Sequence, residues 1–203
     1  MQPRRALISL VGPIFAAAMI TGSVIGLGGC AGTVVGAGAA VGVAAFEERS
    51  VVTVARDGVI AAKIRLALFD AGEKYITRIG IEVYEGRVLL TGAAPDEAMR
   101  AEAVRIAWKA EGVKDVLNEV QISDAGFVDA ARDSWITARL TASLTLDQAV
   151  LAINYSVETV NGIVYLIGVA QNPTELQRVI AHAHQIGYVR KVIPHVRVKK
   201  AGT

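Results

Sequence analysis

The feature that most constrains the fold of this chain is an internal repeat with a constant offset of 76 residues. Residues 86–92, GRVLLTG, match residues 162–168, GIVYLIG, and Asp57 precedes the first segment as Asp133 precedes the second. Further pairs keep the same offset: Ile60 and Ile136, Lys63 and Arg139, Leu68 and Leu144, Ala94 and Ala170, Val113 and Val189, Val116 and Val192, Val120 and Val196. One offset that holds over about 65 positions indicates a duplication, and therefore two small domains.

The first part of each copy is predicted to be a helix followed by a β-hairpin. Apolar residues recur every four positions at Ile60, Ile64 and Leu68, which is the spacing of an amphipathic helix. Residues 79–84 then alternate as a half-buried strand does, and the returning strand follows a turn at Glu85-Gly86. The second copy has Asn161-Gly162 at this turn, a stronger hairpin signal.

A second helix and a last strand complete each copy. In the second copy Asn172 can cap the helix and Pro173 suits its first position. Gly112 and Gly187 fall where glycines end helices, and strands are predicted at residues 116–122 and 192–198. The fold class is therefore α+β, with two tandem α-β-β-α-β units, each having two helices on a three-stranded mixed sheet. Because units of about 65 residues are marginally stable alone, we expect the two copies to contact each other.

The glycine-framed strand, the helix, and the Gly-Val-x-x-Val sequence that leads into the closing strand resemble the BON domain. The first copy keeps the Gly112-Val113 pair, whereas the second has Gly187-Tyr188-Val189. Resemblance to the BON-domain lipoproteins of the bacterial outer membrane implies phospholipid binding, mainly by the second copy, and no catalysis.

The N-terminus has the pattern of an export signal. Arg4 and Arg5 precede an apolar run without charge, and Leu27-Gly28-Gly29-Cys30 closes it. This small-residue box resembles the lipobox of bacterial lipoproteins, which implies cleavage before Cys30 and acylation of that residue. Cys30 is the only cysteine of the chain, so no intramolecular disulfide can form, and lipid capping would remove an exposed thiol.

These features predict the domain organisation. We expect a signal peptide over residues 1–29, a lipidated N-terminus with a Gly/Ala-rich tether over 30–56, a first BON domain over 57–124 and a second over 129–200. Residues 31–45 leave two alternatives open, a flexible tether or a membrane-associated helix, because each interior glycine costs a soluble helix about 1 kcal/mol.

Charge distinguishes the two copies. Without the leader, 19 basic residues face 19 acidic ones, so no overall positive field favours nucleic acid. Residues 57–124 carry 9 basic and 12 acidic side chains, whereas residues 125–203 carry 8 and 5. The second copy is therefore better suited to anionic lipid headgroups.

No catalytic or metal-binding constellation is predicted. His182 and His184 are two positions apart and do not share a helix face, and no cysteine or carboxylate joins them at ligand spacing. No histidine is placed with Ser134 for nucleophilic catalysis. We therefore expect no enzyme, no cofactor and no metal. Trp108 is expected in the core of the first copy.

The candidate binding site is one face of the second copy's first helix. Trp135 lies about 100° around this helix from the core stripe and shares its face with Arg139, Ala142 and Leu146. The first copy has Val59 at the Trp135 position, so the fold does not require an indole there. An indole beside a cation suits the headgroup region of a membrane. The alternative is that Trp135 fills a cleft between the two copies.

The sequence therefore predicts a non-enzymatic lipoprotein, anchored through Cys30 at the periplasmic face of the outer membrane. Its second domain is expected to bind anionic phospholipid and to support envelope integrity. The alternative is a periplasmic scaffold whose paired domains bind envelope or cell-division proteins.

Overall fold

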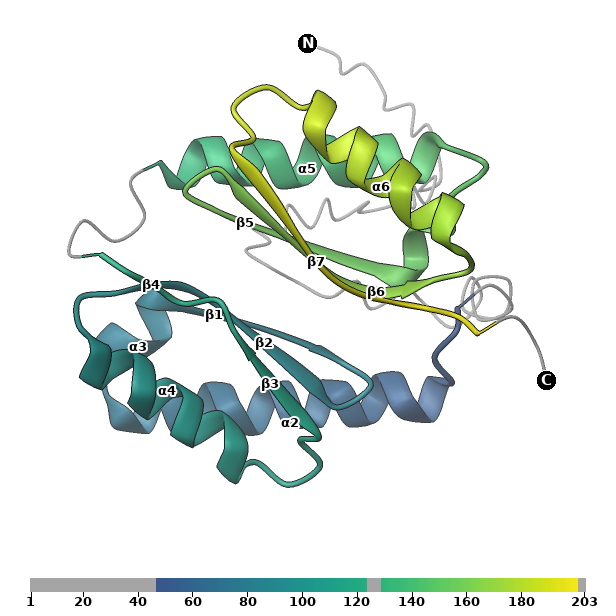
Figure 1. Ribbon diagram of the computed structural model, residues 1–203. Coiled ribbons are helices and arrows are strands. Elements are labelled where there is room, and N and C mark those ends of the chain that lie inside the picture. Colours follow the sequence, from purple (N-terminus) through teal and green to yellow (C-terminus); the bar gives the residue numbers. More distant parts are fainter. Residues whose placement is uncertain (1–46, 124–128, 201–203) are drawn as a thin grey trace, which may run out of the picture. The chain divides into compact units, whose positions relative to one another are not determined.

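The computed structural model describes residues 47–123 and 129–200, which form two similar α+β repeats (Figure 1). The first repeat contains α2 (Val51–Ala71), α3 (Glu73–Arg78), β1 (Ile79–Tyr84), β2 (Arg87–Ala94), α4 (Glu97–Lys109), β3 (Asp115–Asn118) and β4 (Gln121–Ile122). The second contains α5 (Ala130–Leu146), the 3-10 helix η1 (Ala152–Asn154), β5 (Tyr155–Val160), β6 (Ile163–Ala170), α6 (Pro173–Gln185) and β7 (Lys191–Val198). The predicted fold class is confirmed. Cys30 and the predicted signal peptide lie outside the described residues.

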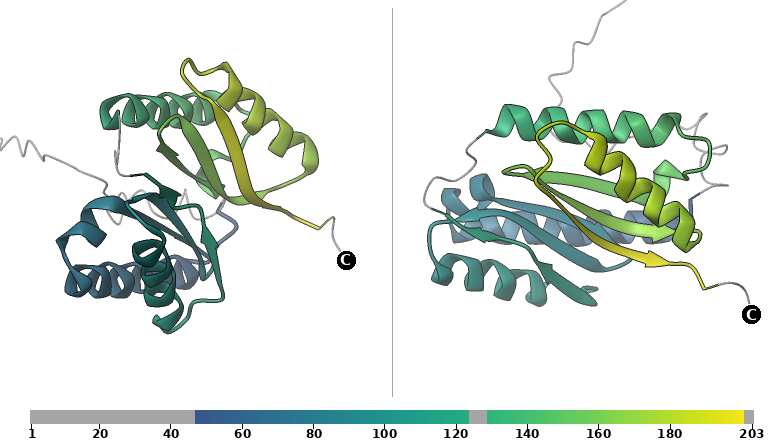
Figure 2. Two further views of the ribbon diagram at one scale, coloured as in Figure 1. Left: turned by 60° about the vertical axis from the view of Figure 1, so that its left-hand side comes forward. Right: turned by 45° about the horizontal axis from the view of Figure 1, so that its top comes forward.

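The four long helices, α2, α4, α5 and α6, begin at polar caps that the sequence supplies. Ser50 accepts a hydrogen bond from the Thr53 N–H, so α2 begins six residues before the helix expected from Asp57. The predicted Asn172 cap is confirmed, since its side chain accepts from the Glu175 N–H and Pro173 follows at the first helical position. In each repeat the two long helices cover the same face of the sheet (Figures 1 and 2).

Each sheet is mixed, with the hairpin's second strand in the middle. β1 pairs with β2 and β5 with β6 in antiparallel fashion, whereas β7 pairs with β6 in parallel over its whole length. In the first repeat the predicted last strand is interrupted, so that β3 and β4 both pair with β2 and the sheet has four strands instead of three. The Asn118 side chain accepts from the Val120 N–H at the interruption, and the register along β2 is the same on both sides.

The predicted core positions are confirmed. Ile64 and Leu140, which are equivalent under the offset of 76, are both fully buried. Each packs with apolar residues of its own repeat, between the helices and the sheet. Trp108 is different: its side chain is 52% exposed, so the expectation that it lies in the core is wrong. The buried stripe of α4 is formed by smaller residues, Met99, Ala103, Ile106 and Ala107, and Trp108 follows on the outer face.

A buried aspartate ties each hairpin turn to the first helix of its repeat. Gly86 and Gly162 sit in equivalent turns as predicted, with φ of 77° and 74°. The carboxylate of Asp133 accepts the N–H groups of Asn161 at 2.6 Å and Gly162 at 2.8 Å. Asp57 binds the first turn in the same way. These bonds satisfy buried donors that a tight turn leaves unpaired.

Candidate functional site

The four predicted site residues lie together on the outer face of α5. Trp135 is 49% exposed and Leu146 is 83% exposed, and Arg139 and Ala142 are exposed between them. The buried residues of α5 lie on the opposite side of the helix, at Asp133, Ile136, Leu140 and Leu144. The face is therefore not used to hold the helix on its own sheet.

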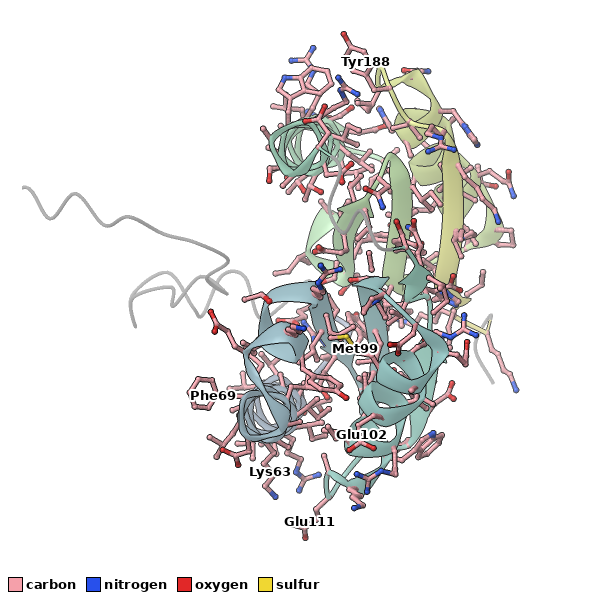
Figure 3. The ribbon with its side chains drawn as sticks, turned by 90° about the vertical axis from the view of Figure 1, so that its left-hand side faces the viewer. Lys63, Phe69, Met99, Glu102, Glu111 and Tyr188 are labelled. Atoms are coloured by element: carbon pink, nitrogen blue, oxygen red, sulfur yellow. The ribbon has the colours of Figure 1, made fainter. Side chains whose placement is uncertain are left out.

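A fifth side chain joins this face from a different part of the chain. Tyr188, in the loop between α6 and β7, places its ring edge-on to Trp135 with ring centroids 6.2 Å apart and planes at 73°. This is a favoured geometry for aromatic pairs. The Tyr188 side chain is 67% exposed and points into solvent (Figure 3). The two rings form an exposed aromatic pair.

The backbone of Tyr188 is unusual and corrects one sequence expectation. Tyr188 has a φ of 71°, and it is the counterpart of Gly112, which has a φ of 94°. The left-handed position of the second repeat is thus Tyr188 and not Gly187. A bulky residue with positive φ is strained, and such strain persists where the surroundings enforce it, often at functional positions.

Arg132 completes the cluster. Its guanidinium carbon lies 4.8 Å from the centroid of the Tyr188 ring, and the same guanidinium pairs with Asp129 at 2.8 Å. Sequence reasoning missed both Arg132 and Tyr188. The signal that could have found Tyr188 was present in the repeat, since a tyrosine stands where the first copy has glycine.

The loop that carries Tyr188 is linked by hydrogen bonds to the helix that carries Trp135. The Arg190 N–H donates to the Gly162 carbonyl at 2.7 Å, and the Gly162 N–H donates to Asp133 of α5. The two halves of the aromatic pair are therefore held by one network. We call Arg132, Trp135, Arg139, Leu146 and Tyr188 the α5 surface.

His182 links two helices of the second domain, whereas His184 is exposed. His182 contacts the Ser143 hydroxyl at 2.8 Å and the Asp147 carboxylate at 2.7 Å, and so connects α6 to the C-terminal part of α5. This hydrogen bond from His182 is the main cause that lowers the pKa of Asp147. In the described parts of the chain, no three or more His, Cys, Asp or Glu side chains are grouped so that they could hold a metal ion.

Within residues 47–123 and 129–200, no helix combines the length and the apolar character that crossing a membrane requires.

Comparison with known proteins agrees with this architecture. The chain is 38% identical over 145 residues to a protein of the gshII 5' region of Anaplasma centrale, which covers 70% of this chain and 95% of that protein. It is 33% identical over 187 residues to the outer membrane lipoprotein DolP of Haemophilus influenzae, and the match covers 90% of this chain and 95% of that protein. It is 34% identical over 149 residues to the 21 kDa hemolysin of Actinobacillus pleuropneumoniae, and the match covers 72% of this chain and 76% of that protein.

The model of the BON domain matches the chain twice, at residues 56–124 and 132–200. Each match covers one of the two structural repeats, and together they cover more than half of the chain. The protein therefore belongs to the BON-domain family and contains two BON domains.

Proposed function

We propose that the protein is a non-enzymatic lipoprotein of the outer membrane whose second BON domain binds anionic phospholipid. The observation that carries this proposal is the α5 surface, where an exposed aromatic pair lies beside two arginines. Trp and Tyr rings favour the headgroup region of a membrane, and each nearby cation adds about 1 kcal/mol on an anionic bilayer. Leu146, at the far end of the same helix face, adds apolar surface.

The strain at Tyr188 supports a functional interpretation of this surface. The first repeat shows that glycine fits the left-handed position, so folding alone does not require tyrosine there. Burial does not explain it either, because most of the Tyr188 side chain faces solvent. A ligand that contacts the ring would explain why the strained residue is present.

The anchor and the location belong to the same proposal. Cys30 would carry acyl chains, and several chains on one residue exceed what stable membrane attachment requires. The support is the lipobox-like sequence and the relative named an outer membrane lipoprotein, which is similar over 90% of this chain. We further propose that the protein faces the periplasm, supports envelope integrity, and holds its two BON domains in contact. Replacing Cys30 with Ser should abolish metabolic labelling by fatty acid, and label that remains would contradict the anchor.

Lipid binding is tested by co-sedimentation of residues 46–203 with vesicles. We expect binding to anionic but not to neutral vesicles, and we expect salt to weaken it because screened charges contribute less. Trp135→Glu should reduce binding by about tenfold or more, since a charge replaces an aromatic anchor at the interface. The matched control is Trp108→Glu, which changes an equally exposed tryptophan of the first repeat.

Fluorescence sharpens the same test. The chain has two tryptophans, so a Trp108→Phe background isolates Trp135. Its emission should shift to the blue on adding anionic vesicles. Binding by Trp135→Glu equal to that of the parent would contradict the proposal, as would unfolding of the second domain in that variant. Binding to partner proteins without any binding to vesicles would favour the scaffold alternative.

A further inference from the structure

A hollow lies in the first BON domain at the place where the second carries its aromatic pair. This cavity, of about 710 Å³, opens beside the N-terminal half of α2 and is bounded by the hairpin turn and by the loop between α4 and β3. Both Val59 and Gly112 line it. Under the offset of 76 these are the counterparts of Trp135 and Tyr188. The first domain therefore has space where the second has two rings.

The lining has the composition of a binding pocket. Val51, Val52 and Ile60 provide apolar walls, and six charged residues also line the cavity. Lys63 is already paired with Glu111 at 3.0 Å, and both side chains lie at the outer edge of the domain (Figure 3). Asp57 is occupied by the hairpin turn and by Arg49. Arg56 makes no hydrogen bond or ion pair within the described residues, and it is the counterpart of Arg132.

An apolar stripe continues from the cavity along the exposed face of α2. Its members are spaced alternately three and four residues apart, and all are exposed: Val52, Ala55, Val59, Ala62, Leu66 and Phe69. The large ones are 55–63% exposed, and Phe69 projects away from the helix (Figure 3). The residues that hold α2 on its sheet, such as Ile64 and Leu68, form a separate stripe.

This spacing is the one by which one helix packs along another, with the small alanines allowing close approach. A small molecule could fill the cavity but would leave most of the stripe uncovered. An anionic membrane fits less well, because Glu85 and Glu111 line the cavity and residues 57–124 carry three more acidic than basic side chains. The surface therefore fits a protein segment.

We infer that the first BON domain binds an amphipathic helix of another protein, which lies along the α2 stripe and inserts an aromatic side chain into the cavity. The inserted ring takes the space that Tyr188 and Trp135 occupy in the second domain. Arg56 stacks on it, as Arg132 stacks on Tyr188 at 4.8 Å. This surface is distinct from the α5 surface and does not depend on lipid binding there.

The test uses the full-length chain in detergent micelles and a monomeric, lactam-stapled helical peptide as the probe. The peptide carries leucine at its apolar positions and one fluorotryptophan, which is followed by fluorine NMR. We expect a saturable shift of the fluorine signal with the protein and none with empty micelles. An unlabelled peptide with leucine in place of the fluorotryptophan should compete less well.

Two substitutions fill the cavity with the side chains of the second domain. Val59→Trp and Gly112→Tyr should each weaken binding of the peptide by about tenfold or more, as expected when a central pocket is closed. Gly112→Tyr could disturb folding, because a Cβ at Gly112 would lie 3.1 Å from the Ile60 side chain. Val59→Trp changes an exposed side chain and therefore fills the cavity without this contact. Arg56→Gln should weaken binding of the peptide by about two- to fivefold. Lys74→Gln, on α3, and Trp135→Glu are controls that should leave binding of the peptide unchanged.

The proposal is overturned if both cavity-filling variants bind the peptide like the parent, or if Trp135→Glu removes the signal. It is also overturned if these variants change vesicle binding while the peptide signal stays constant, since the cavity would then face lipid. A dimer of the chain that Leu66→Arg dissociates, seen by sedimentation velocity, would assign the stripe to a second copy instead.

Discussion

The two BON domains share a scaffold and differ at one corner of it. In both, a buried aspartate of the first helix holds a left-handed hairpin turn. Beside that turn the first domain has Val59 and Gly112 around a cavity, and the second has Trp135 and Tyr188 in edge-on contact. The duplication therefore kept the turn and its aspartate and changed the exposed side chains beside them. We expect experiments to separate the domains most strongly at this corner.

The largest expected effect concerns the shared core. Ile64→Ala and Leu140→Ala should each reduce the free energy of unfolding by about 2–5 kcal/mol, because both side chains are fully buried between helix and sheet. Chemical denaturation of each variant measures this loss. If one substitution cost much less than the other, the two positions would not be equivalent, and the two domains would not share the same core.

The next effect concerns the aspartates. Asp57→Ala and Asp133→Ala should each cost about 1–3 kcal/mol, because the buried N–H of Gly86 or of Gly162 is left without its acceptor. Asp57 also pairs with Arg49 at 3.2 Å, so its replacement removes one of the two carboxylates that Arg49 contacts. Denaturation of both variants, with Asp96→Ala as a control at an exposed helix cap, tests this. Stability equal to that of the parent would show that water can replace the carboxylate.

Tyr188→Gly should change the stability of the second domain little and its binding to vesicles more. Relief of left-handed strain gains about 1 kcal/mol. Loss of the ring contacts with Trp135 and Arg132 costs about the same, so the melting temperature should stay nearly constant. Vesicle binding should nevertheless fall. A stable variant that binds like the parent would show that Tyr188 is not part of the lipid surface, and would leave its strain without an explanation.

The smallest effect is a pH dependence of the second domain that comes from the contact between His182 and Asp147. His182 holds the pKa of Asp147 below its usual value of 3.8. A lowered pKa in the folded state stabilises the fold above the unfolded pKa, and this contribution is lost as pH falls through the folded value. Thermal unfolding near neutral pH and near pH ~3 should therefore show a slightly larger acid loss for the parent than for Asp147→Asn.

The first domain provides the contrast for this experiment. The counterparts of Ser143 and His182 are Ala67 and Ile106, which pack in its apolar core. It therefore has no equivalent of the polar link between the two helices. An acid loss that Asp147→Asn leaves unchanged would mean that other groups set the pH dependence.

The sequence by itself determined the scaffold. A constant offset aligns two sets of helical and strand periods, and each set is dictated by backbone geometry and by the need to bury one face of every element. For the same reason Trp135, Arg139, Ala142 and Leu146 could be placed on one exposed helix face from spacing alone. Local periodicity could not place Trp108, because its α4 neighbours include small residues that complete the core without it.

Only the tertiary structure decided which side chains meet at the corner where the proposed binding surfaces lie. Tyr188 is 53 residues from Trp135 along the chain, and its contact depends on the loop between α6 and β7 returning to the start of α5. The cavity of the first domain likewise needs three separate segments and the absence of two aromatic rings. Periodicity reports which way each side chain of one element points. The distance between side chains of different elements depends on loop conformation and packing, and these follow from the whole fold.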